Sequence, residues 1–448
     1  MLGTLGVLFS GPVAGVTVDK TGYSLAIVSG SLAIGSGYYL FRKQFEEAYS
    51  SVPYTCFLLF CVGSGSTFIN AACIKCCMVT FPSIRGLATS LPVAMYGISA
   101  MCYSAVGSRF YPGDTAGFLG FLSTSSLIVA ALCGPMICLC DRSSHIHHRI
   151  GTDTPRASAS IELTNFGSGT VTPVRQAGNP MPIAGFKNPD HDITASRPLF
   201  KQIEFWALAT ILSVIAGIGQ MYVYSVGYVV TSLFGDSKFI AQHTATYSIL
   251  VQQQQQLQVG IISLASCTGR ISSGLLADIF SSTLHWSRTW LLFVPGVLIF
   301  SAQILGATVS SLQAVGVTSS LLGFGYGFLY CILPIIVGDI WGLTNFSFNW
   351  GITNVFTIIP NMVLAGYFGR VYDSHVTLKE FSLVVGGGDD GAKETIKLMV
   401  CDLGRECYNS AFKLTALLSL VALLLIGFFN LRQHAVSKRH LKQRRLSS

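Results

Sequence analysis

Apolar runs of about 20 residues follow one another along almost the whole chain, and this spacing constrains the fold more than any other feature. A helix of that length crosses the hydrocarbon core of a bilayer, which is roughly 30 Å thick. The sequence therefore predicts an all-α, polytopic membrane helix bundle. The candidate spans lie near 1–17, 23–41, 54–80, 84–107, 116–140, 204–231, 258–280, 289–308, 311–340, 346–372 and 411–431.

The scarcity of charged side chains also predicts a membrane protein. Of the 448 residues, 51% are hydrophobic and 11% are charged, whereas an average soluble protein carries about 25% charge. So few charged side chains cannot solvate the surface of a chain this long in water, and lipid must cover much of that surface. Because apolar material extends from end to end, we predict one bundle rather than separate soluble domains.

A polar segment divides the predicted spans into two groups. Residues 1–140 form an N-terminal half with five spans, and residues 201–432 form a C-terminal half with six. The linker at 141–200 is rich in Ser, Thr, Pro and Gly, has little hydrophobic periodicity and is predicted to be disordered. Its arginines and lysines place it in the cytosol. Two six-helix halves joined by a cytosolic linker is the plan of the major facilitator fold, with about 11 of 12 helices present here and the first absent.

The ends of the spans predict a topology. The basic tail at 433–448 directly follows a span, so it obeys the positive-inside rule and is predicted to be cytosolic rather than to bind nucleic acid. The glutamine run Gln252 to Gln256 and the polar stretch from 373 to 409 then become non-cytosolic loops. We expect lipid as the main partner of the surface, and a monomer.

Most cysteines lie in apolar segments, where cysteine behaves as a small hydrophobe. Cys73, Cys76 and Cys77 resemble half of a metal site, but no second Cys or His pair follows at ligand spacing. The sequence thus predicts no metal and no cofactor. Cys401 and Cys407 flank a non-cytosolic loop, where a disulfide is compatible with the redox compartment.

A short motif recurs in both halves at the predicted cytosolic ends of helices. Glycine permits a tight turn and close helix contact, and an aspartate can sit against the positive N-terminus of a neighbouring helix. Any tight turn after a helix can carry Gly and Asp, but two copies at equivalent places indicate a conformational motif. Its residues are Gly15, Asp19, Lys20 and Gly22 in the first half and Gly274, Asp278 and Arg288 in the second.

Longer segments carry a more specific resemblance. The chain resembles the fungal monocarboxylate-transporter homologues, a nodulin-like branch of the major facilitator superfamily. The resemblance implies a transporter placed at the vacuolar membrane, and it does not assign the substrate. The segments that carry it are 68–77, 81–88, 91–100, 341–351 and 366–373.

Arg270 is the first candidate for solute binding. It lies eight residues before Asp278, and so about 12 Å into the membrane at 1.5 Å per residue. Intramembrane charges are costly and often functional. In monocarboxylate transporters an Arg follows an Asp by one turn; here Arg270 matches the Arg, but Ser266 stands at the Asp position. A guanidinium suits a carboxylate, while a structural pairing of Arg270 inside the bundle is the alternative.

Two further polar residues lie in one N-terminal span. Asn70 is deep enough to line a cavity, although an Asn inside a bundle commonly bonds a neighbouring helix. Lys75 lies close enough to the cytosolic face to extend its ammonium group to water. We therefore predict Arg270, Ser266 and Asn70 as solute-binding residues.

The sequence predicts no enzyme, since Asp339 and Asp373 lie at opposite ends of adjacent spans and could not share a proton. We predict secondary transport of a small, anionic, monocarboxylate-like solute by alternating access, with proton coupling left open. The alternatives are a solute sensor that does not transport and an inactive, truncated transporter.

Overall fold

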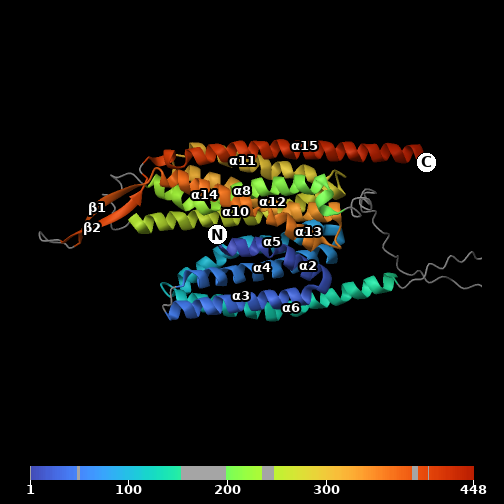
Figure 1. The fold of residues 1–448 in the computed structure, drawn as a ribbon, viewed down its shortest axis with the longest axis horizontal. Helices are drawn as coiled ribbons and strands as arrows, with labels where there is room; N and C mark the ends of the chain where they lie inside the picture. The colour runs from blue at the N-terminus through green and yellow to red at the C-terminus, as the bar shows by residue number, and fades with distance from the viewer. Residues whose placement is uncertain are drawn as a thin grey trace, which may run out of the picture.

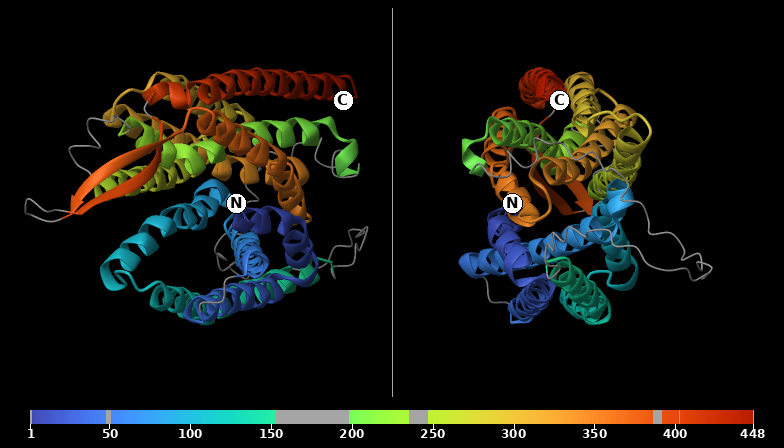
Figure 2. Two further views of the ribbon diagram at one scale, coloured as in Figure 1. Left: turned by 60° about the vertical axis from the view of Figure 1, so that its left-hand side comes forward. Right: turned by 90° about the vertical axis from the view of Figure 1, so that its right-hand side faces the viewer.

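The computed structural model describes residues 2–47, 51–152, 198–234, 247–385, 392–401 and 403–447. Helices dominate it, and they run roughly parallel to one long axis (Figure 1). We call the end at which residues 141–152 and 198–202 lie the linker end, and the opposite end, which carries a β-hairpin, the hairpin end. The N-terminal and C-terminal halves form two adjacent groups of helices (Figure 2).

The N-terminal half holds five span-like units in its described part. The first consists of two short helices, because Pro12 restarts the helix after Ser10. The helices are α1 (Leu2–Phe9), α2 (Gly11–Thr21), α3 (Tyr23–Glu46), α4 (Val52–Thr80), α5 (Arg85–Phe110) and α6 (Thr115–Thr152), with a 3-10 turn at Pro82–Ile84.

The C-terminal half holds six such units among its described residues. One is again divided, into α13 and α14. The helices are α8 (Ile203–Leu233), α10 (Tyr247–Ser282), α11 (Phe293–Thr308), α12 (Leu312–Trp341), α13 (Phe346–Val355), α14 (Ile358–Asp373) and α15 (Asn409–Ser447). Short 3-10 turns lie at Leu199–Lys201, Arg288–Leu292 and Gly404–Cys407.

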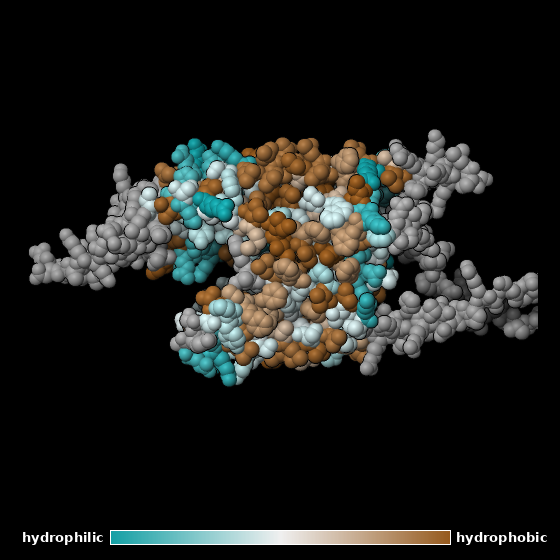
Figure 3. All heavy atoms as spheres, viewed as in Figure 1, coloured by the Kyte–Doolittle hydropathy of each residue, from teal (hydrophilic) through white to brown (hydrophobic). Residues whose placement is uncertain are grey.

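The hydropathy of the surface fits a membrane protein. In the part of the chain that the structure describes, nine helical segments are long and apolar enough to cross a bilayer. The two other predicted spans are α5, which is less apolar, and the divided α1–α2 unit. Apolar side chains cover the middle of the visible face, and hydrophilic ones lie at its two ends (Figure 3). The predicted all-α, multi-pass architecture is confirmed.

Burial differs sharply between the halves. In the most apolar window of α12, 78% of residues are buried inside the protein, against 11% in that of α6. The main core consists almost entirely of C-terminal residues, joined by Ile74, Met78 and Val93 from the other half. The N-terminal half has its own small core, made of Val18, Tyr23, Ala26, Ile27, Ala72 and Cys76. Its outer helices therefore expose much apolar surface.

Several predicted boundaries are corrected. The glutamine run is not in a loop, because α10 begins at Tyr247 and carries it within the helix. There Gln255 Nε2 donates to the carbonyl oxygen of Gly227 on α8 at 3.1 Å, so one of the glutamines joins two helices. Helix α6 continues to Thr152, and the basic tail continues α15 as helix. The remainder of the predicted linker, 153–197, lies outside the described residues.

The predicted loop between 373 and 409 contains two antiparallel strands, β1 (Thr377–Val385) and β2 (Ala392–Val400), with Thr377 opposite Val400. A disulfide joins Cys401 to Cys407 at the base of this hairpin. Next to it, the hydroxyl of Tyr408 donates to the carbonyl oxygen of Val309 at 3.2 Å. Burial raises the pKa of Tyr408 to about 12. These contacts attach the hairpin to the start of α15.

Candidate functional site

Asp19, at the end of α2, joins the two halves at the linker end. Its carboxylate accepts hydrogen bonds from the backbone amides of Ser347, at 3.2 Å, and Phe348, at 2.8 Å, in the first turn of α13. The ammonium group of Lys75, on α4, lies 2.6 Å from the same carboxylate. The Asp19 side chain is only 3% exposed. Asp19 thus caps a helix of the opposite half, where the partial positive charge of the helix N-terminus favours an anion.

Asp278, at the end of α10, makes the reciprocal contact. Its two oxygens accept from the backbone amides of Gly86 and Leu87, each at 2.9 Å, at the start of α5. Arg288 lies 3.5 Å from Asp278 and binds both oxygens of Asp339, on α12, at 2.9 Å. We call Asp19 with Lys75 the first clasp, and Asp278 with Arg288 and Asp339 the second clasp.

The motif glycines bring the helix backbones together beside these clasps. A Cβ added to Gly274 would lie 2.5 Å from the carbonyl oxygen of Gly86, and one added to Gly15 would clash with the backbone of Ser347. Gly22 adopts a φ of 88°, which favours glycine, between α2 and α3. The two halves therefore meet closely at the linker end. Lys20 is exposed and forms no ion pair within the described part of the chain.

Arg270 lies farther along the same interface. Its side chain is on α10, the residue is 6% exposed, and its Nη1 donates to the carbonyl oxygen of Val93 on α5 at 2.6 Å. The guanidinium carbon is 6.0 Å from the ring centre of Tyr96. Gly97 leaves the space that the guanidinium fills, because a Cβ there would clash with Nη1. The buried Nε has no acceptor in the described structure. Only one of the five N–H groups of this arginine is thus bonded to a described protein acceptor.

A group of tyrosines surrounds Arg270 on its C-terminal side. Tyr326 and Tyr330, on α12, lie near the guanidinium, and their ring centres lie 4.8 Å apart. The hydroxyl of Tyr326 donates to Oε1 of Gln220, on α8, at 2.7 Å. We call Arg270, Tyr96, Tyr326, Tyr330 and Gln220 the arginine cluster. It offers one cation and several neutral hydrogen-bonding groups, which suits a small anion.

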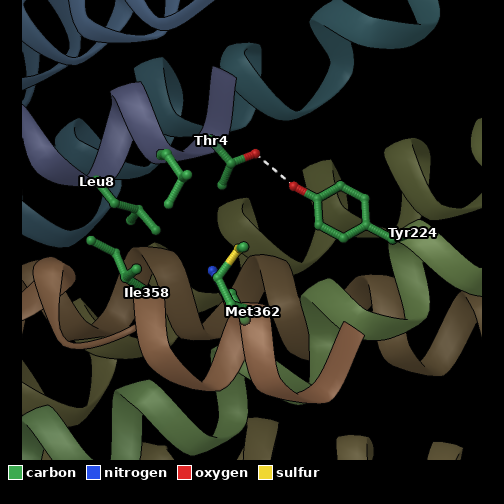
Figure 4. A pocket seen from close by; sticks show the side chains of 7 residues that line it. Thr4, Leu8, Tyr224, Ile358 and Met362 are labelled. Atoms are coloured by element: carbon green, nitrogen blue, oxygen red, sulfur yellow. Dashed lines mark hydrogen bonds between the residues drawn. The ribbon is translucent and has the colours of Figure 1, made fainter. Parts of the chain in front are cut away.

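A small pocket lies between the halves, where α1 meets α8 and α14 (Figure 4). Thr4 and Tyr224 line it, and their hydroxyls lie 2.6 Å apart. Leu8, Ile358 and Met362 form its apolar side. Asn361 also lines the pocket, and its buried Oδ1 lacks a donor. Tyr224 lies near Tyr326, so the pocket adjoins the arginine cluster.

The predicted solute-binding residues do not all come together. Ser266 is buried one turn before Arg270, and its backbone packs against Gly327. Asn70 is half-buried on α4 and forms no hydrogen bond with the described members of the arginine cluster. The sequence did not reveal that Lys75 pairs with Asp19. It also gave no reason to select the tyrosines, since they stand in ordinary apolar spans.

Comparisons with known proteins agree with this architecture. Residues 3–156 match the nodulin-like family model. Over 97% of its length the chain is 23% identical to an uncharacterized membrane protein of Saccharomyces cerevisiae, YMR155W, 88% of which is covered. It is 26% identical to the probable transporter mch1 of Neurospora crassa, over 80% of this chain and 66% of that protein. The probable transporter MCH1 of Wickerhamomyces anomalus is 24% identical, with coverages of 83% and 71%.

Among solved structures, the major facilitator transporter FucP in its outward conformation aligns with 96% of this chain and 88% of its own, at 13% identity and a TM-score of 0.49. The nodulin-like match and the MCH1 alignments confirm the resemblance predicted from the sequence: residues 3–156 are similar to nodulin-like proteins, and most of this multi-pass membrane chain is similar to the MCH1 probable transporters.

Proposed function

We propose that this protein is a secondary transporter that moves a small, monocarboxylate-like anion across a membrane by alternating access. The observation that carries the proposal is Arg270, a buried guanidinium at the interface of the halves with four N–H groups that no described protein acceptor binds. A carboxylate binds a guanidinium through two parallel hydrogen bonds. The relatives named as probable transporters support the same general function.

The contacts between the halves support a state that is closed at the linker end. Both clasps and the glycine contacts lie there. Toward the hairpin end, α5 diverges from the C-terminal half (Figure 2), and its Tyr96, Tyr103 and Phe110 are exposed. Solute would reach the arginine cluster from the hairpin end, and opening of the clasps would release it at the other end.

The membrane orientation is part of the proposal. Arg142 and Arg149 begin a basic linker, and the tail at 433–448 is basic too, which favours the cytosol for the linker end. The disulfide between Cys401 and Cys407 favours an oxidising compartment for the hairpin end. The vacuolar membrane meets both conditions. Tags inserted at Ser168 and after Ser448 should both be digested by protease added to the cytosolic side of sealed vesicles; opposite protection of the two would refute this orientation.

The test of function is uptake of labelled pyruvate by the purified chain in liposomes. Arg270→Lys keeps the charge but loses the planar fork, so uptake should fall. Arg270→Gln should lower it further, by about 10- to 100-fold, the usual worth of a charge-assisted hydrogen bond. Arg42→Gln is the matched control, because Arg42 is an exposed arginine on α3 that pairs with Glu46.

Three outcomes are informative. Uptake that depends on Arg270 but not on Arg42 supports the proposal. Unchanged uptake in Arg270→Gln would make this arginine a structural residue. Pyruvate binding that depends on Arg270, without uptake, would identify a solute sensor instead.

A further inference from the structure

The described groups around Arg270 include no carboxylate. From α5 the guanidinium faces the carbonyl of Val93 and the ring of Tyr96. From α12 it faces Tyr326, Tyr330 and Cys331. All of these side chains are neutral at physiological pH. The residue is 6% exposed, so the described neighbours fill most of its immediate surroundings and none of them is a carboxylate.

The acidic group closest in sequence cannot supply the missing charge. Asp278 lies eight residues after Arg270 on α10, more than two turns away. Its oxygens already bind the amides of Gly86 and Leu87 and face Arg288. Among the described residues, no carboxylate compensates the charge of Arg270.

Because of this charge, the solute-free form and the anion-bound form differ in how easily they reorient across the membrane. During alternating access the solute site must pass through a state that is sealed from water on both sides. In the solute-free form that state holds a desolvated, unpaired guanidinium, whereas an anion in the site converts it into a neutral pair. The insertion cost of one arginine at mid-membrane corresponds to a roughly 100-fold lower population of the sealed, solute-free state.

We infer that this protein is an anion exchanger: it returns across the membrane only with a second monocarboxylate-like anion in the site, and protons do not drive it. The inference rests on the proposed function. A proton-coupled carrier would need a carboxylate that pairs with Arg270 when the site is empty and is protonated when solute binds. Ser266, one helical turn before Arg270 on α10, stands where such a carboxylate could pair with it, and it cannot ionise.

The experiment compares uptake of labelled pyruvate into liposomes that contain unlabelled pyruvate or only sulfate buffer. The exchange arm should exceed the sulfate arm at least tenfold, toward the roughly 100-fold limit set by the unpaired charge. An inward proton gradient should leave uptake into the sulfate-loaded liposomes unchanged. Equal uptake in the two arms, or uptake driven by the proton gradient, would overturn the inference while leaving pyruvate transport established. No uptake in either arm would instead refute the proposed function itself.

A substitution at Ser266 tests the physical cause. Ser266→Asp should pair with Arg270, allow the empty protein to reorient, and give proton-driven uptake into sulfate-loaded liposomes. Ser266→Asn adds nearly the same volume without charge, so it should remain dependent on internal pyruvate. If the Asp variant exchanges pyruvate but gains no net uptake, or if both variants gain it equally, charge balance at Arg270 is not the cause.

Discussion

Both clasps hold an aspartate of one half against a helix N-terminus of the other half, but the charged side chains beside the aspartate differ. In each, an aspartate at the end of a helix in one half caps a helix of the other half: Asp19 caps α13, and Asp278 caps α5. In the first clasp, α4 supplies a cation, Lys75. In the second, α12 supplies an acid, Asp339, and the cation Arg288 comes from the turn after α10. α4 and α12 are each the second helix after the one that carries the capping aspartate.

The contact between the aspartate and the helix N-terminus is the part that both clasps share. Both aspartates bind two adjacent backbone amides, and that contact needs only a carboxylate and a helix N-terminus. The remaining charges differ in sign and in origin, so their task is to hold the aspartate in place and balance it. The first clasp has one acid and one base. The second has two acids around Arg288, with Arg85 also acting on Asp339.

The largest expected effect is loss of Arg288. Arg288→Gln leaves Asp278 and Asp339 facing each other and removes the bond from Nε to the carbonyl oxygen of Ala277. Breaking a buried ion pair on one side costs about 3 kcal/mol. The matched change Lys75→Gln removes the cation of one acid rather than of two, so it should cost less. Apparent unfolding temperatures in detergent should rank wild type, Lys75→Gln and Arg288→Gln in falling order.

A second substitution sharpens the same test. Asp339→Asn combined with Arg288→Gln removes the repulsion between the two acids, so it should recover part of the lost stability. Equal unfolding temperatures for Lys75→Gln and Arg288→Gln would show that the third charge of the second clasp has no energetic consequence.

A smaller effect is expected from neutralising the capping aspartates. Asp19→Asn and Asp278→Asn keep an acceptor oxygen but lose the attraction to the helix N-terminus, which is worth about 0.3–2 kcal/mol. Each should shift the protein away from the state closed at the linker end and slow exchange, while equilibrium binding of pyruvate stays nearly intact. Distances between spin labels on the exposed residues Thr21 and Ser282 would report the shift.

The two aspartate variants also test the comparison itself. We expect similar shifts for both, because the contact with the helix N-terminus is the part that the clasps share. Lost pyruvate binding with an unchanged distance distribution would mean that these aspartates act on the solute rather than on the closed state.

The sequence by itself determined the class of fold. Charge scarcity and apolar runs of membrane-spanning length leave only a lipid-embedded helix bundle, because these are properties of each segment alone. The paired Gly and Asp motif also pointed to Asp19 and Asp278, since a turn and a helix end are local features. The glutamine run was misplaced because its composition resembles a loop, while its packing against α8 is what sets its structure.

Only the tertiary structure decided which side chains meet. Lys75 was expected to reach water, yet it lies against Asp19 from a different helix. Arg270 was a candidate from its depth alone, but its neutral surroundings come from Val93 and Tyr96 on α5 and from Tyr326 and Tyr330 on α12. Helix periodicity fixes the face on which a residue lies, but it does not fix which helix packs there. That packing sets which groups surround a buried charge. It therefore determines whether the protein itself or a bound anion balances the charge of Arg270.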